Sequence, residues 1–302
     1  MLKPLRHWKT HVRDALELAL LPGLAAVLPW RLCFALFKRF ARWPWLYRTA
    51  CDAALREALA RGQIRTEQAA DWIAQRRLVT LLDHADLYLA LTRSNAWMHR
   101  HLHVEGQWPS GELPGIVCTF HWGAGMWSLR HAKAQGMRCH ALVAPLEGAH
   151  FAGRPILHRY AQIRTAAVAT ALGNAHLDVS ASLRPGLRAL AKGEQILAAI
   201  DVPADQVAAS IPVTIGGMQA MVPKGLLRMA VEQRIPVTIY LTRIDLQTGD
   251  RLLRIIQLGV ADNLESLAQQ AFSYLDKAIT LDSSAWHFWS EAPRFFTSAP
   301  TT

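Results

Sequence analysis

A histidine that directly follows a short apolar run is the residue of this sequence best suited to chemistry. Residues 115–120 (GIVCTF) have the length and composition of a buried strand, and His121, Gly123 and Gly125 come after them. An imidazole with a pKa of about 6.5 is mostly neutral near pH 7 and can accept a hydroxyl proton. Glycines let backbone N–H groups approach a ligand, and a following helix N-terminus favours negative charge. The segment predicts proton removal and oxyanion binding, the alternative being a hydrogen-bonded structural histidine.

A carboxylate stands at an equivalent place further along the chain. Asp201 follows the apolar run 195–200 (QILAAI) and precedes Val202 and Pro203. Ligands of open α/β sheets bind beyond the carboxyl ends of the strands. If both runs are neighbouring parallel strands, His121 and Asp201 face one pocket. The alternative is that the aspartate only forms a turn.

No spacing in the sequence predicts a cofactor or a metal. The nucleotide fingerprint G-x-G-x-x-G does not occur. The closest histidine pairs, His101/His103 and His121/His131, have no convincing third ligand. We therefore expect neither a bound cofactor nor a metal site.

An α/β fold would position these residues. From residue 106 onward, apolar runs typical of strands alternate with amphipathic stretches typical of helices, which predicts a central, mostly parallel sheet flanked by helices. We expect residues 106–302 to form this domain and residues 1–105 to form a helical N-terminal region with a long helix from Thr66 to about residue 100. Strands are expected at 115–120, 139–144, 195–200, 209–215, 236–244 and 251–258. Helices are expected at 124–135, 152–163, 183–192, 224–234 and 263–280.

Residues 15–37 are the most apolar part of the N-terminal region. Their longest uncharged run, residues 18–30, has thirteen residues, whereas a spanning helix needs roughly twenty. Pro22, Gly23 and Pro29 interrupt it, and basic residues and tryptophans lie on both sides. The pattern predicts a broken helical hairpin lying in the membrane interface, the alternative being a buried pair of core helices.

The charge of the chain favours an anionic partner. The 302 residues carry a formal net charge of +10 and include 11 tryptophans. Aromatic rings and Lys/Arg side chains gather at membrane interfaces, so an anionic membrane surface is the expected partner. No nucleic-acid partner is expected, because the sequence has no zinc-ligand spacing, no RNP-like strand and no basic run longer than two residues.

Four segments, taken in order, resemble a known family. They are HWGAGM (121–126), LAKGEQILAAIDVPAD (190–205), SIPVTIGGMQAMVPKGLLRMA (210–230) and WHFWSEAPRFF (286–296). Their order and spacing resemble the lysophospholipid acyltransferase superfamily, and within it the late acyltransferases of bacterial lipid A biosynthesis. That family carries His-x4-Asp/Glu after a strand. The resemblance covers nearly the whole chain, although each segment alone is weakly specific.

The resemblance implies transfer of a fatty acyl group from an acyl carrier protein or acyl-CoA thioester to a hydroxyl of a lipid or pigment-type acceptor. It implies His121 as the general base and Asp201 as the family's aspartate beyond the histidine motif. It also implies a peripheral or monotopic location on the cytoplasmic face of a bacterial inner membrane. Three arginines, Arg154, Arg159 and Arg164, lie where the family has basic residues that position anionic groups. The alternative for them is a solvated helix face.

Met126 departs from the family motif, because it stands where the family has the acid that orients the histidine. Loss of a comparable orienting aspartate in serine proteases costs roughly 10⁴ in kcat. Another carboxylate could substitute, Asp201 first and Glu147 second. Alternatively, the acceptor could be a more acidic hydroxyl, such as a phenol with a pKa of about 10. The remaining alternative is a catalytically weakened or inactive protein that binds an acyl chain or a carrier protein.

Overall fold

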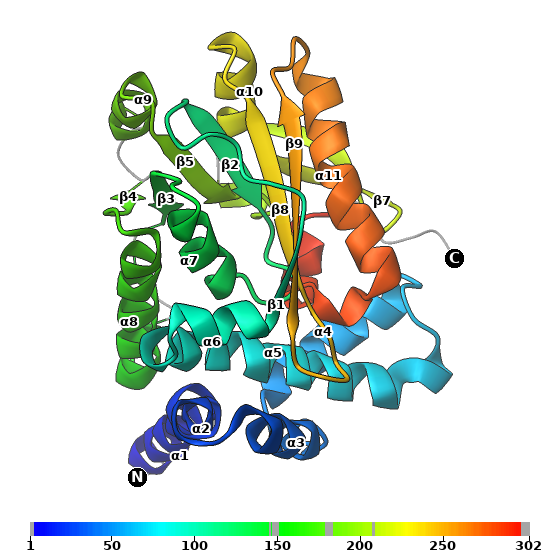
Figure 1. The fold of residues 1–302 in the computed structure, drawn as a ribbon. Coiled ribbons are helices and arrows are strands. Elements are labelled where there is room, and N and C mark those ends of the chain that lie inside the picture. Colours follow the sequence, from blue (N-terminus) through cyan, green and yellow to red (C-terminus); the bar gives the residue numbers. More distant parts are fainter. Residues whose placement is uncertain (1–2, 145, 147–150, 179–183, 207–208, 297–302) are drawn as a thin grey trace.

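The core of the protein is a seven-stranded, mostly parallel sheet. In the computed structural model, the described residues are 3–144, 146, 151–178, 184–206 and 209–296. The strand order among them is β1-β9-β8-β2-β5-β3-β4 (Figure 1). Strands β8, β2, β5, β3 and β4 run parallel, whereas β9 is antiparallel to β8 and β1 runs parallel to β9. The α/β fold predicted from the sequence is confirmed. The main-sheet strands are β1 (Leu102–Glu105), β2 (Gly115–Thr119), β3 (Cys139–Val143), β4 (Leu177–Asp178), β5 (Gln195–Ala199), β8 (Val237–Ile244) and β9 (Arg251–Gly259).

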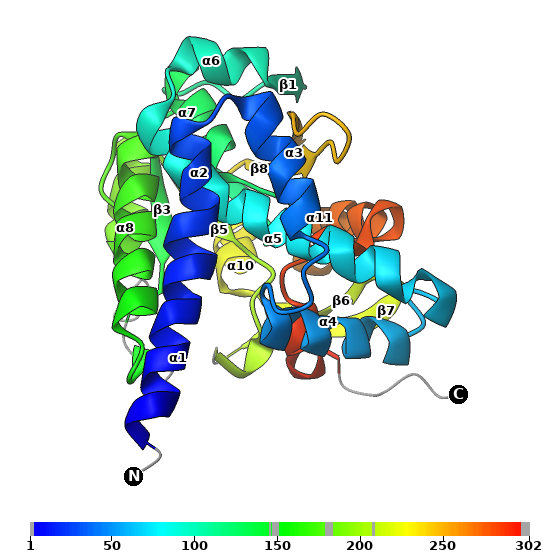
Figure 2. The same cartoon turned by 90° about the horizontal axis from the view of Figure 1, so that it is seen from below.

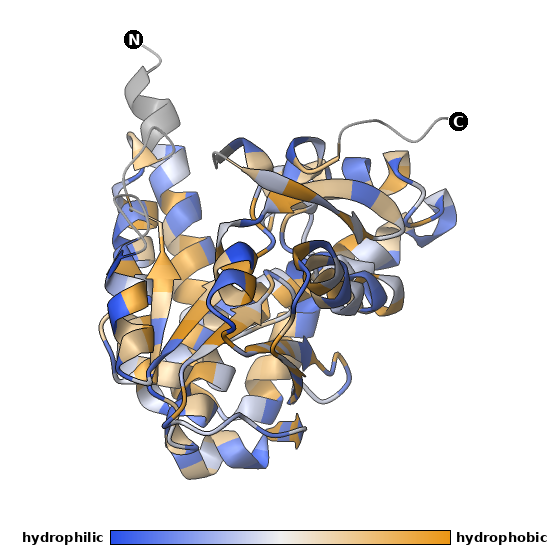
Figure 3. Cartoon of the chain, turned by 90° about the horizontal axis from the view of Figure 1, so that it is seen from above, coloured by the Kyte–Doolittle hydropathy of each residue, from blue (hydrophilic) through white to orange (hydrophobic). Residues whose placement is uncertain are grey.

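Helices cover both faces of the sheet. Strand β8 shows this directly, because neighbouring strand residues point to opposite faces. Ser128 of α7 shares a hydrogen bond with Thr242, while Leu241 faces α11 across a narrow groove. The central strands are accordingly apolar, whereas the helices carry hydrophilic outer faces (Figure 3). These helices are α7 (Met126–Ala134), α8 (Pro155–Leu172), α9 (Arg184–Ala191), α10 (Gly225–Glu232) and α11 (Leu264–Leu281).

One predicted strand of the main sheet lies elsewhere. Residues 209–215 were expected in the main sheet, but β6 (Ser210–Ile215) pairs with β7 (Met218–Pro223) in a separate antiparallel hairpin. The turn between them is Gly216–Gly217, with φ of +60° and +74°. Two successive left-handed residues suit a tight two-residue hairpin, and glycine adopts them without strain. The expected long helix also divides, into α5 (Ala69–Thr92) and α6 (Asn95–Arg100), where Ser94 caps the second helix.

The N-terminal helix continues through a proline. Helix α1 (Lys3–Ala15) passes through a π-helical segment (Leu16–Leu20) into α2 (Leu21–Val27). Pro22 has no N–H to give the carbonyl of Leu18 four residues earlier, and the hydroxyl of Tyr88 donates to that carbonyl instead, at 2.6 Å. The chain breaks at Leu28, which is extended (φ −85°, ψ 151°) as residues before proline prefer, and α3 (Trp30–Phe40) follows.

The N-terminal helices lie along the carboxyl edge of the parallel strands. Helix α5 crosses this edge, and α2 and α3 pack on α5 from the side away from the sheet (Figures 1 and 2). Helix α4 (Arg48–Ala60) joins the same layer. Within the described part of the chain, none of the helices has both the length and the apolar composition that a membrane crossing requires.

A buried ion pair ties this layer to the sheet. Arg251, the first residue of β9, is fully buried and donates to Asp86 of α5. Its guanidinium lies 4.6 Å from the ring centre of Trp127 in α7 and 5.4 Å from that of Trp30 in α3. One cation therefore joins three helices and a strand. Because its charge has left water, it depends on the carboxylate that faces it.

We predict that Asp86→Ala lowers the free energy of unfolding by about 3–5 kcal/mol, since it leaves the Arg251 charge buried without its partner. The matched control is Asp262→Ala, which removes an exposed partner of Arg234 and should change stability by less than about 1 kcal/mol. Urea unfolding followed by circular dichroism measures both. Equal losses in the two variants would contradict a role for this pair in joining the layers.

Candidate active site

His121 and Asp201 meet at the carboxyl edge of the sheet. Strands β2 and β5 are paired, and the two residues follow them on adjacent strands. Nδ1 of His121 lies 2.9 Å from Oδ1 of Asp201. The backbone N–H of His121 also lies 2.9 Å from both carboxylate oxygens. The contact that the sequence predicted from two strand ends is therefore present in the structure.

The geometry defines which nitrogen of His121 can act as a base. A carboxylate only accepts hydrogen bonds, so Nδ1 carries the proton that it donates to Asp201, and Nε2 of the neutral ring keeps its lone pair. The His121 side chain is 40% exposed, whereas Asp201 is fully buried. The ring of Phe288 lies against the imidazole with the ring centres 4.4 Å apart. The site thus presents a basic nitrogen to the exterior and holds its carboxylate partner inside.

A tryptophan from the C-terminal segment completes the surroundings of Asp201. Nε1 of Trp286, a fully buried residue, donates to Oδ2 of Asp201 at 3.0 Å. The backbone N–H of His287 donates to the carbonyl of His121 at 2.7 Å. The C-terminal segment is therefore laid directly against the residue that carries the base.

Gly123 is required for close backbone packing. It has a φ of +69°, and a Cβ at this position would lie 2.0 Å from the carbonyl oxygen of Thr242. Its N–H donates to the carbonyl of Ala285 at 3.0 Å, and its own carbonyl accepts from Nε2 of His287 at 2.7 Å. Because the N–H of Gly123 already donates to Ala285, it is not free to bind an oxyanion. The oxyanion-binding role expected from the sequence therefore falls to Gly125 and the start of α7.

Gly125 leads into the first turn of α7. It is partly exposed, has an ordinary φ of −93°, and would tolerate a Cβ, because nothing lies within 4 Å of that position. The first N–H groups of a helix have no carbonyl partner within the helix and carry partial positive charge. This helix N-terminus is the anion-binding feature that the segment offers.

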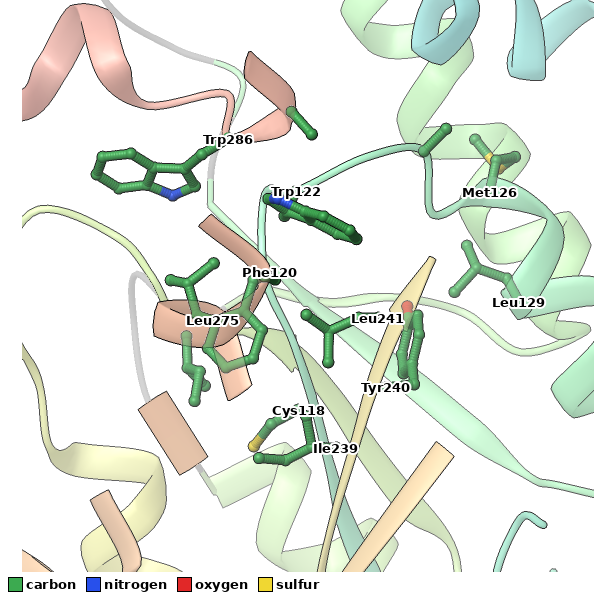
Figure 4. Close-up of a cluster of buried hydrophobic side chains, with 14 of the residues drawn as sticks. Cys118, Phe120, Trp122, Met126, Leu129, Ile239, Tyr240, Leu241, Leu275 and Trp286 are labelled. Atoms are coloured by element: carbon green, nitrogen blue, oxygen red, sulfur yellow. The ribbon is translucent and has the colours of Figure 1, made fainter. Parts of the chain in front are cut away.

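Met126 begins α7 and is buried. Figure 4 shows it in the apolar cluster together with Leu129. A carboxylate placed there would leave water for apolar surroundings, which is costly. Asp201 contacts the histidine instead, whereas Glu147, the second carboxylate considered, lies outside the described residues.

Arg76 of α5 fixes the backbone of the C-terminal segment at residues 284–287. It is buried and donates to the carbonyls of Ser284 (3.1 Å), Trp286 (3.0 Å) and His287 (3.1 Å). Its Nη2 also lies 3.4 Å from Nδ1 of His287. Because a guanidinium can only donate, Nδ1 of His287 accepts and Nε2 carries the proton given to Gly123. A continuous hydrogen-bond network therefore links His121 and Gly123, through His287, to Arg76 of α5.

Three titratable groups in and beside this network have shifted pKa values: Asp83, His84 and His287. Arg164 of α8 pairs with Asp83 of α5 at 2.7 Å and holds the pKa of that carboxyl at about 2, although burial opposes this shift. Burial lowers the pKa of His84 to about 4, and burial together with Arg76 lowers that of His287 to about 3. Both histidines are therefore neutral in the folded protein near pH 7.

The three arginines predicted to position anionic groups have different surroundings. Arg164 is bound to Asp83 as described, and Arg154 pairs with Asp14 of α1 at 2.6 Å. Arg159 is exposed on α8. The contacts described for Arg154 and Arg164 are with these carboxylates rather than with His121 or Asp201, so both arginines tie α8 to its neighbours.

Sequence reasoning missed Arg76, Trp286 and His287 as parts of the site. The segment containing Trp286 was noted for its resemblance, but nothing in a single sequence says that its indole faces Asp201. Arg76 lies in an amphipathic helix among other charged residues, and only the fold reveals that it is buried.

No cluster of three or more His, Cys, Asp or Glu side chains suited to a metal ion occurs among the described residues. Comparison with known proteins gives no assignment, because no protein-family model and no curated protein matches the chain.

The low pKa of His287 predicts a pH dependence of stability. In the unfolded chain this histidine binds a proton near pH 6.5, whereas in the folded protein it does so only near pH 3, so acidification favours unfolding between these values. From pH 7 to 4.5, His287→Gln should lose roughly 2–3 kcal/mol less unfolding free energy than the wild type. Urea unfolding at both pH values measures this, with His103→Gln as the exposed-histidine control. The same pH slope in His287→Gln and wild type would contradict the lowered pKa of this imidazole in the folded protein.

Proposed function

We propose that the protein is a membrane-associated acyltransferase that moves a fatty acyl group from a thioester to a hydroxyl acceptor. The observation that carries this proposal is the His121–Asp201 pair, in which a buried carboxylate fixes the tautomer and leaves Nε2 open to the exterior. The order of the four sequence segments that resemble acyltransferases supports the same chemistry. The donor is an acyl carrier protein or acyl-CoA thioester, and the acceptor is a lipid or pigment-type molecule.

The reaction follows from these groups. Nε2 of His121 takes the proton of the acceptor hydroxyl while that oxygen attacks the thioester carbonyl. The resulting oxyanion is stabilised at the N-terminus of α7, next to Gly125. The C–S bond then breaks, and the imidazolium returns its proton to the leaving thiolate, which restores neutral His121. Asp201 stabilises the imidazolium between the two proton transfers, as the buried aspartate does in serine proteases.

Asp201 removes the need for an acid at position 126. Met126 lies in the apolar cluster, and the imidazole already has its carboxylate partner from β5. An aliphatic hydroxyl and a phenol therefore both remain within reach of this base.

The N-terminal helices supply a surface suited to a bilayer. Trp8, Val12 and Leu20 are exposed at intervals of four or eight residues and form one stripe along the α1–α2 rod, which ends at Val27, 74% exposed. Leu32 of α3 and Trp45 add to the exposed apolar residues of this region.

Exposed basic residues flank these apolar residues: Lys9, Arg31, Lys38, Arg39 and Arg42. Apolar and cationic side chains together favour binding in the interface of an anionic membrane. Figure 2 looks at this side of the molecule. We place it against the cytoplasmic face of the inner membrane.

The catalytic role of His121 predicts that His121→Ala lowers the rate of acyl transfer by roughly 10²- to 10⁴-fold. The assay follows thiol release from myristoyl-CoA or myristoyl acyl carrier protein in detergent. Monoacylglycerol supplies an aliphatic hydroxyl and 4-octylphenol a phenolic one. The matched control is His103→Ala, which removes an exposed histidine.

Equal rates in wild type and His121→Ala would refute this role. Absence of turnover with either donor and either acceptor, together with salt-sensitive binding of the carrier protein, would favour the non-catalytic alternative.

The membrane surface predicts that the double variant Leu20→Glu/Val27→Glu binds phosphatidylglycerol vesicles at least about tenfold more weakly, because two exposed apolar side chains no longer enter the interface. Vesicle flotation measures the bound fraction. Leu113→Glu is the matched control, since Leu113 is 60% exposed in the loop before β2, at the amino edge of the sheet. Unchanged flotation of the double variant would contradict the proposed surface.

A further inference from the structure

A narrow groove lies between α11 and strands β8 and β9, beside the turn at residues 121–125, which we call the catalytic turn. Its volume is about 130 Å³, and its apolar lining includes Trp122, Leu241 and Ala278. Helix α11 contributes Tyr274, Lys277, Ala278 and Leu281, whose spacing places them on one face of the helix. We name this pocket the α11 groove.

The α11 groove is distinct from the His121–Asp201 pair. The carboxylate of Asp201 follows β5 on one side of β2, whereas the groove lies over β8 and β9 on the other side. Trp122 links the two places, because it lines the groove and is the residue next to His121. A ligand in the groove would thus contact the catalytic turn without contacting the base.

Cations surround this apolar slot. Arg243 of β8, Arg254 of β9 and Lys277 of α11 are exposed and line the groove, against one carboxylate, Glu105. The nearest approach of Glu105 to Arg254 is 3.9 Å, and both side chains are mostly exposed, so the acid neutralises little of the charge. On the strands, each apolar residue that lines the groove lies opposite a cation: Leu241 pairs with Arg254, and Leu252 pairs with Arg243.

The shape limits the ligand. The volume of about 130 Å³ is slightly below that of a cavity of about 150 Å³ that holds one benzene molecule, so the slot has room for a short stretch of hydrocarbon and not for a pair of acyl chains. Beyond Arg243, Leu252 and Leu281 the groove meets a larger, polar pocket of about 960 Å³ between α5 and the β8–β9 turn. Leu281, at this junction, is one of the most exposed large apolar residues of the described chain. The slot therefore holds part of a single chain, and the remaining carbons of that chain lie outside it.

We propose that the α11 groove binds a fatty acid anion, with the hydrocarbon chain among Trp122, Leu241 and Ala278 and the carboxylate at Arg243, Arg254 and Lys277. Arginine forks match a carboxylate in a bidentate manner, and an apolar slot beside them favours an amphiphile over a free inorganic anion. This site does not depend on the proposed acyl transfer, because none of its residues carries the reaction.

Isothermal titration calorimetry with dodecanoate, below its micelle concentration, tests the proposal on the intact protein. We expect one site per chain, with an affinity that falls as salt is raised. Dodecanoate should bind at least tenfold more tightly than 1-dodecanol, which has the same chain and no charge. Arg243→Gln/Lys277→Gln should weaken dodecanoate binding roughly tenfold or more, as expected for loss of charged hydrogen-bond donors. Ala278→Phe, which fills the slot, should abolish it.

Matched variants separate this site from the other two. Arg228→Gln removes an exposed cation of α10, Leu20→Glu/Val27→Glu alters the membrane surface, and His121→Ala removes the base; all three should leave dodecanoate affinity within twofold of wild type. Arg243 and Lys277 are exposed, so their replacement by glutamine should not disturb folding. The test therefore still holds if the buried Ala278→Phe substitution prevents folding. Equal affinity for dodecanol, unchanged binding by Arg243→Gln/Lys277→Gln, or loss of binding in His121→Ala would overturn the proposal.

Discussion

The carboxylate of Asp201 is the group on which the arrangement of the site depends. It is fully buried and accepts hydrogen bonds from the backbone and ring of His121 and from the indole of Trp286. These donors come from two distant parts of the chain, the end of β2 and the C-terminal segment, and they meet the aspartate at the end of β5. A buried charge is tolerated only when it is satisfied in this way, so the same contacts that orient the base also fix the edge of the sheet.

This constraint explains how the proposed active site can be organised although methionine stands at position 126. The imidazole needs one acceptor at Nδ1, and β5 supplies it from the neighbouring strand. Position 126 is then free to join the apolar core, where a second carboxylate would be costly. Behind the turn, Arg76 and the neutral His287 hold the backbone of the C-terminal segment and of Gly123, so the base rests on α5 as well as on the sheet.

The parts of this account that the sequence predicts are those encoded locally. Apolar runs that end in a polar residue identified β2 and β5, and therefore His121 and Asp201, because parallel neighbours share an edge. The hairpin of β6 and β7 was missed although Gly216–Gly217 is its turn signal, since the apolar run before it also suited the main sheet. The roles of Arg76 and Trp286 were beyond a single sequence, because burial and partners 85 or more residues away come only from the fold.

The central claim is that Asp201 acts through His121, and a double-mutant cycle on the rate of acyl transfer tests it most directly. The four proteins are the wild type, His121→Ala, Asp201→Asn and the double variant, each assayed for thiol release under identical conditions. If the carboxylate acts only through the imidazole, Asp201→Asn lowers the rate strongly in the wild type and has no effect once His121 is absent. Equal fold-losses from Asp201→Asn in both backgrounds, or no loss in either, would contradict the account.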